Sequence, residues 1–189
     1  MIGAEHGPLD RTPGIRPRPS LWRRLDAAAR TCFPLAATAL LLLVLAAPLG
    51  LPAQAELLPA VALACVFFWT LFRPASMTPP AVFVLGLLAD LLGDALPGTQ
   101  IVTLLIAHGL ILRWRRSLVR QGFLLVWLAY CGITAGAAAF AWALGSLLSL
   151  SLLPAAPAVF QAVISAGFYP ALAIVLVRTH RGLAAPEQA

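Results

Sequence analysis

The stretch Pro79–Gly98 reads PPAVFVLGLLADLLGDALPG and combines two features that rarely occur together. It is apolar enough to cross a bilayer, and it carries two carboxylates, Asp90 and Asp94, one helical turn apart. A charged side chain at the bilayer centre costs roughly 2.5–3.5 kcal/mol on insertion scales. The stretch therefore predicts a membrane helix in which the acid has a partner or a task.

The composition of the rest of the chain agrees with a membrane protein. Of its 189 residues, 61% are hydrophobic and 11% are charged, whereas soluble domains have about 45–50% and about 25%. The net charge of +6 does not indicate nucleic-acid binding, because the basic residues follow a membrane topology. We expect an all-α membrane protein of one domain, without a separate soluble domain.

Six apolar segments predict six membrane-spanning helices in a membrane domain of residues 33–178. Residues 20–32 predict a helix that lies on the membrane surface or extends the first span. The Pro-, Gly- and Arg-rich residues 1–19 predict a disordered cytoplasmic arm, and residues 179–189 a cytoplasmic tail. The expected spans are Phe33–Gly50, Glu56–Phe72, Pro80–Leu96, Thr99–Leu112, Gly122–Leu150 and Pro157–Val177.

The arginines give the orientation of the spans. They occur before the first span, in every second connection and after the last span, and the other connections contain none. Because positive residues remain in the cytoplasm, both termini are predicted to be cytoplasmic. A segment that did not span would break this alternation. The arginines are Arg11, Arg16, Arg18, Arg23, Arg24, Arg30, Arg73, Arg113, Arg115, Arg116, Arg120, Arg178 and Arg181.

Asp90 and His108 are the ionisable residues that we expect to meet inside the membrane. Asp90 lies ten residues after Pro80, about 15 Å along a helix and near the midplane, and Gly86 shares its face. The turn at Pro97 and Gly98 returns the chain as the next span. Positions at equal distances from such a turn lie level, so Asp90 and His108 are predicted neighbours that share a hydrogen bond or an ion pair. Asp94 is expected nearer the outer surface.

These residues do not form a recognisable catalytic or metal-binding pattern. A metal site needs three or four ligands, and Asp90, Asp94 and His108 are the only intramembrane candidates, without a helical ligand spacing. Intramembrane acids also serve proton or ion relays, but no second acidic span supports transport. A structural role for Asp90, as a buried acid that fixes helix register and binds neighbouring donors, is the favoured interpretation. We expect no enzyme activity and no cofactor.

Two further features could bind partners. Gly132 and Gly136 form a GxxxG motif that predicts close packing with another helix, within the bundle or from a partner. The predicted basic loop carries Arg113, Arg115, Arg116 and Arg120. This loop is available to cytoplasmic partners or anionic lipids, or it serves only to set the topology.

Taken in order, these motifs resemble the rod shape-determining protein MreD family. The resemblance rests on FFWTLFRP, on Pro80, Gly86, Asp90 and Gly93, on Pro97-Gly98 and on a short span that ends in RWRR. It covers residues 20–181. Asp94 stands where the family usually has a glycine.

The resemblance implies a fold similar to the six-helix substrate-binding subunits of energy-coupling-factor transporters. It also implies a non-catalytic scaffold of the cell-elongation machinery in the bacterial inner membrane. Expected partners are an MreC-like single-span protein and, through it, MreB-like filaments and peptidoglycan synthases. The alternative is a substrate-binding subunit of a small-molecule, vitamin-type transporter.

Overall fold

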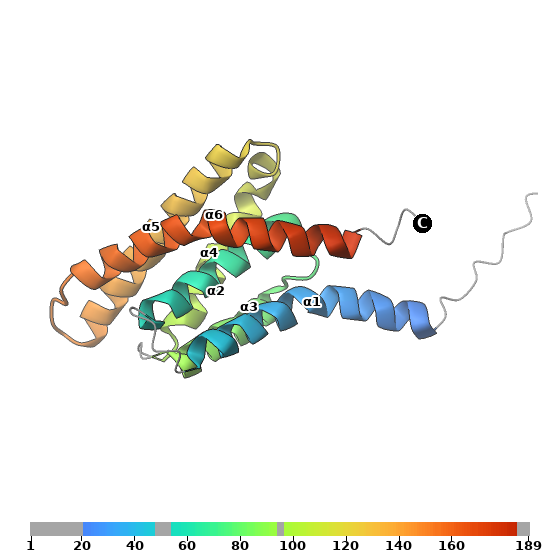
Figure 1. Cartoon of the computed structure of the whole chain (residues 1–189). Coiled ribbons are helices and arrows are strands. Elements are labelled where there is room, and N and C mark those ends of the chain that lie inside the picture. The colour runs from blue at the N-terminus through green and yellow to red at the C-terminus, as the bar shows by residue number, and fades with distance from the viewer. Residues whose placement is uncertain (1–20, 48–53, 94–96, 185–189) are drawn as a thin grey trace, which may run out of the picture.

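The computed structural model describes residues 21–47, 54–93 and 97–184, and within these ranges the chain forms six helices and no strand (Figure 1). The all-helical fold class is therefore confirmed. The helices are α1 (Leu21–Ala46), α2 (Gln54–Phe72), α3 (Pro79–Leu92), α4 (Thr99–Leu118), α5 (Phe123–Leu148) and α6 (Ala156–Ala184).

Three helices continue beyond the expected spans. Residues 21–32 are the first half of α1 and not a separate element. The helix α4 continues through the RWRR sequence to Leu118, where Arg115 and Arg116 in the last turn favour the negative end of the helix dipole. The helix α6 continues to Ala184 and includes the first part of the expected tail. The arm of residues 1–19 lies outside the described residues, as do residues 185–189.

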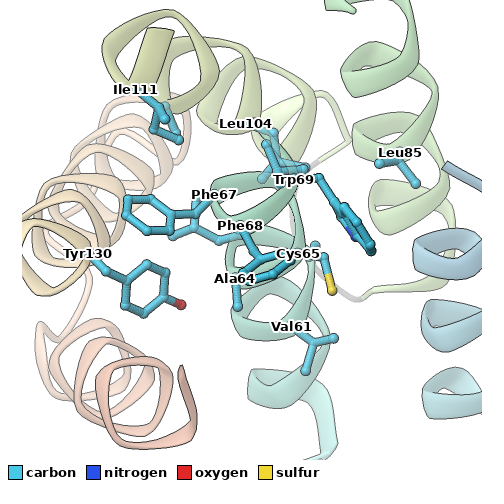
Figure 2. Packing of buried hydrophobic residues seen from close by; sticks show 14 of the residues in the cluster. Val61, Ala64, Cys65, Phe67, Phe68, Trp69, Leu85, Leu104, Ile111 and Tyr130 are labelled. Carbon is cyan, nitrogen blue, oxygen red and sulfur yellow. The ribbon is translucent and has the colours of Figure 1, made fainter. Parts of the chain in front are cut away.

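The helix α2 forms the core of the molecule. Every residue from Ala60 to Leu71 is buried, and a helix that is apolar on all sides is stable only when other elements surround it. Figure 2 shows side chains leaving α2 in opposite directions, with Phe67 on the side of Tyr130 and Trp69 on the opposite side. The other helices are therefore arranged around α2.

Aromatic contacts join α2 to the last two helices. The ring of Phe67 makes edge contacts with Tyr130 of α5 and Tyr169 of α6, at centroid distances of 5.1 and 5.4 Å. Tyr130 and Tyr169 stack at 4.2 Å. The hydroxyl of Tyr130 also lies 3.1 Å from Oγ of Ser165, which gives its polar end a partner.

The helices α1, α3 and α4 cover the remaining sides of α2. The chain changes direction within α1 (Figure 1), and Pro34 lies inside this helix. Proline removes one backbone hydrogen bond and bends a helix. The helices α3 and α4 form an antiparallel hairpin with an extensive common interface. This hairpin carries the acidic residue with which the sequence analysis began.

Among the residues that the structure describes, two helices are long and apolar enough to cross a membrane, namely Phe123–Leu148 and Ala156–Arg178. Only 28% and 22% of their most apolar windows are buried within the protein. They therefore differ from core helices of a soluble protein, which are mostly buried. Three shorter apolar helices are Thr31–Ala46, Leu57–Phe72 and Pro79–Leu92.

Candidate functional site

Asp90 is buried, and its carboxylate binds the beginning of α4. The backbone N–H of Gln100 donates to Oδ1 at 3.0 Å, and the N–H of Ile101 donates to Oδ2 at 3.2 Å. These are the second and third residues of α4, whose N–H groups have no partner within the helix. A side chain at the N-cap position usually binds them. Asp90 supplies this cap from a different helix.

The local sequence explains why α4 needs such a cap. Its N-cap residue is Gly98, which has no side chain and adopts a left-handed conformation with φ of 92°. Glycine adopts this conformation without steric cost, so the tight turn excludes a capping side chain. The positive end of the α4 dipole also favours the negative charge of Asp90. The carboxylate is therefore compensated by two N–H groups and a helix end.

Gly86 lets the two helices approach closely. A Cβ atom at this position would lie 2.7 Å from the Cα atom of Ile101. Ile101 is also one of the two residues that donate to Asp90. Gly86, Asp90 and Gly98 thus serve one structural unit, which we call the capped hairpin. It consists of α3, the turn and the first turn of α4.

The predicted bond between Asp90 and His108 is wrong. The two helices turn back earlier than the position of Gly98 suggested, because α3 already ends at Leu92. Asp90 therefore lies level with Gln100, and His108 is eight residues, or about 12 Å, further along α4. Asp90 lies close to the end of α3, beside the turn, and not halfway along a helix that continues to residue 96.

His108 has a different partner, which the sequence analysis did not identify. Its Nδ1 atom lies 2.9 Å from Oγ1 of Thr70 on α2. The ring is almost fully buried, and Nε2 has no hydrogen-bond partner among the described residues. His108 thus connects α4 to the core helix instead of to α3. A polar residue in the apolar α2 sequence was the available signal for this contact.

The outer part of the predicted site is only partly described. Asp94 lies outside the described residues. Pro97 is exposed at the turn, and Gly93 ends α3, where its N–H donates to the carbonyl oxygen of Ala89. Neither of these residues adds a functional side chain to the hairpin.

The predicted basic loop is wrong, because most of its residues belong to the helix α4. Arg113, Arg115 and Arg116 belong to the last turns of α4, and only Arg120 lies in the connection to α5. Nε of Arg115 donates to the carbonyl oxygen of Leu71 at 2.8 Å, near the end of α2. Arg113, Arg116 and Arg120 are exposed. One arginine thus binds the negative end of α2, and the others face outward.

Gly132 and Gly136 do not pack closely against another helix within the part of the chain that the structure describes. A Cβ atom at either position would meet nothing within 4 Å. Both residues line an apolar groove of about 470 Å³ between α4 and α5. Thr103 also lines this groove, and its buried Oγ1 atom has no hydrogen-bond partner. Packing of the GxxxG face within the described bundle is therefore not observed, and the alternative, contact with a partner helix, stays a prediction.

The described side chains form no group of three or more His, Cys, Asp or Glu residues that could hold a metal ion. The chemistry that the capped hairpin supports is the binding of backbone N–H groups by a carboxylate. Both oxygens of Asp90 are used for this. The geometry gives Asp90 a structural partner on α4.

Within the described ranges, the chain is thus an all-helical protein of six helices with many exposed apolar side chains. The chain matches no protein-family model, no curated protein and no solved structure.

Proposed function

We propose that the chain spans the bacterial cytoplasmic membrane six times, with both termini in the cytoplasm. Its apolar exterior supports this placement, because soluble proteins rarely expose large continuous apolar patches. Leu91, Leu147 and Val163 are 74%, 70% and 65% exposed on α3, α5 and α6. In a bilayer these side chains would contact lipid.

The positions of the arginines support the proposed orientation. Arg115 contacts the end of α2. Leu118 at the end of α4 and Arg178 of α6 line the same groove as Phe72. The arginine-bearing ends of α4 and α6 therefore lie together beside the end of α2, as the positive-inside rule requires of cytoplasmic ends. The capped hairpin lies at the other end of α3 and α4.

Within this membrane, we infer that the protein is a non-catalytic scaffold of the rod-shape elongation machinery. The observation that carries this proposal is the capped hairpin. The residues on which the resemblance to the MreD family rests most, Gly86, Asp90 and Gly98, have structural tasks in a single hairpin. Residues that hold a hairpin in shape, and that do not carry out a chemical step, fit a scaffold protein better than an enzyme. Its partners would be an MreC-like single-span protein and, indirectly, MreB-like filaments and peptidoglycan synthases.

The open groove between α4 and α5 is a suitable surface for the single helix of such a partner. Small residues allow helix backbones to approach closely in a membrane, and Gly132 and Gly136 are exposed there. A vitamin-type transporter subunit would instead need a pocket with converging polar groups. The cavity among α2, α4, α5 and α6 measures about 20 Å³, which is the size of one water molecule.

Depletion of the protein in its native host tests the scaffold role. Rod-shaped cells should become round, and the wild-type gene should restore them. Restoration by a Gly132→Ile variant should fail if the groove holds a partner helix, whereas Leu128→Ile on an exposed face of the same helix should restore shape.

Unchanged shape together with a nutrient-uptake defect would support the transporter alternative. Co-purification of a single-span coiled-coil protein, or of a vitamin and an ATPase pair, separates the same two functions.

Reporter fusions test the membrane topology independently of function. A reporter that is active only outside the cytoplasm should be active when inserted at Leu152 and inactive when inserted at Arg120. Activity at both sites would contradict the six-span arrangement, even if depletion changed the cell shape.

A further inference from the structure

A second large groove lies at the arginine-bearing end of the protein, between α2, α5 and α6. Its volume is about 470 Å³, within the range of about 300–1,000 Å³ typical of ligand sites. The walls are apolar and come from Phe68 and Phe72 of α2, Phe123 and Val126 of α5, and Ala173 and Val177 of α6. Such walls suit a hydrocarbon chain. We call this site the α2–α6 groove.

Gln121, Tyr169 and Arg178 supply the polar side chains of the α2–α6 groove, and the charged one is Arg178. Arg178 is exposed, and Arg120 lies next to Gln121 in the chain. The segments that line the groove contain no Asp or Glu. Among the described residues, the groove thus combines an apolar lining with a positive charge that no acidic lining residue compensates.

The beginning of α5 adds to this positive potential. The first N–H groups of a helix have no partner within it, and the N-cap residue Gly122 provides no side-chain hydrogen bond. Phe123, the first residue of α5, lines the groove. A helix N-terminus attracts phosphate groups through its N–H groups and its dipole.

We propose that the α2–α6 groove binds one anionic phospholipid of the cytoplasmic leaflet. One acyl chain would lie along Phe72, Val126 and Ala173, and the headgroup phosphate would face Arg178 and the N-terminus of α5. The inference rests on the proposed membrane placement and not on the scaffold role. It would hold equally for a protein with another cellular task.

The positive charge of the α2–α6 groove favours an anionic lipid over a neutral lipid or the N-terminal arm as its occupant. The grooves between α4 and α5 and between α5 and α6 are similar in size, about 470 and 430 Å³, but no charged residue lines them. The arm of residues 1–19 carries Arg11, Arg16 and Arg18 against Glu5 and Asp10, so a net positive charge disfavours it beside Arg178. A neutral lipid would leave the positive charge without a partner.

Native mass spectrometry of the full-length protein in mild detergent tests the proposal. The probes are palmitoyl-oleoyl phosphatidylglycerol and the phosphatidylcholine with the same acyl chains. The wild type should bind its first molecule of phosphatidylglycerol more tightly than its first molecule of phosphatidylcholine. Arg178→Gln should weaken the binding of phosphatidylglycerol about fivefold, as expected for one cation at a membrane surface. The matched control is Arg113→Gln, which removes an exposed arginine outside the groove and should change the affinity less than twofold.

A second pair of variants tests the apolar part of the site. Ile174→Trp places a large side chain in the α2–α6 groove, and Val163→Trp places one in the groove between α5 and α6. Both positions are exposed, at 59% and 65%, so both variants should fold. Only Ile174→Trp should reduce the binding of phosphatidylglycerol, by about tenfold or more, because it occupies the acyl-chain position.

Four results would overturn the proposal. Equal losses in Arg178→Gln and Arg113→Gln would indicate attraction by the total charge instead of a site. Equal binding of the two lipids would indicate an apolar occupant without headgroup recognition. Competition by millimolar inorganic phosphate alone would indicate a free-phosphate site. A dimer that loses lipid on assembly, and that Ile174→Trp disrupts, would identify a second copy of the chain as the occupant.

Discussion

The carboxylate of Asp90 on α3 accepts a hydrogen bond from the backbone N–H of Gln100 on α4, at 3.0 Å. An acid in an apolar helix is thereby converted into the N-cap of its neighbour. The contact explains why the sequence can combine a buried carboxylate with a glycine at the N-cap position of the next helix.

Removal of the Asp90 side chain should destabilise the fold. Asp90→Ala leaves two N–H groups at the start of α4 without acceptors, and we expect a loss of about 2–3 kcal/mol in the free energy of unfolding. Asp90→Asn keeps one acceptor oxygen and should lose about half as much. Equilibrium unfolding in mixed detergent micelles, followed by tryptophan fluorescence, measures both losses. Leu91→Ala, at an exposed neighbouring position, is the control, and an equal loss there would contradict the cap.

Gly86 should not tolerate even one methyl group. Gly86→Ala would place Cβ 2.7 Å from the backbone of Ile101, so the hairpin must open at a cost of about 1–3 kcal/mol. Gly132→Ala meets no atom within 4 Å and should be neutral or stabilising by up to about 1 kcal/mol, because alanine favours the helix. The same unfolding measurement compares the two variants. Equal stabilities would show that the α3–α4 approach is less tight than the structure indicates.

Arg115 should contribute to stability while its neighbour Arg116 should not. Arg115→Gln removes the bond from Nε to the carbonyl oxygen of Leu71 and should cost about 1 kcal/mol, since this bond is charge-assisted but only half-buried. Arg116 is exposed, so Arg116→Gln should remain within about 0.5 kcal/mol of the wild type. Thermal unfolding in detergent distinguishes them. If both variants lose the same stability, the net charge is responsible instead of the bond.

Thr70 and His108 should be energetically coupled. Thr70→Val leaves the Nδ1 atom of His108 buried without a partner and should cost about 1–3 kcal/mol. In a His108→Leu background the same change should cost much less, because no buried polar group is then left unpaired. A double-mutant cycle in mixed micelles should give a coupling energy of about 1 kcal/mol. Additive effects would mean that the 2.9 Å contact contributes nothing to stability.

The helical elements could be predicted because their signals are local. The apolar segments and the turn at Gly98 gave six helices, and most of their ends lie within a few residues of the expected positions. The errors were at the helix ends. The RWRR sequence was interpreted as a loop, although arginine is compatible with a helix and favourable in its last turn.

The partners of the buried polar residues could not be predicted in the same way. Asp90 and His108 lie at nearly equal distances in sequence from Gly98, and they would lie level only if the hairpin turned at Gly98. The early end of α3 at Leu92 shifts the register of the pair by several residues. Such a change in register moves a side chain to another position along the neighbouring helix and to another face of it. The GxxxG spacing of α5 predicted a face for close helix packing, but spacing alone does not indicate whether a helix of the same chain covers that face or leaves it open for a partner.

The sequence by itself determined the helical class, the six helices of the described residues and the alternation of arginine-bearing and arginine-free connections. These properties follow from hydrophobic content, turn residues and the order of charges, none of which depends on contacts between distant parts of the chain. Only the tertiary structure decided that Asp90 caps α4, that His108 binds Thr70 and that Gly132 and Gly136 remain open. These contacts depend on the register and rotation of packed helices, and small differences in loop length set both.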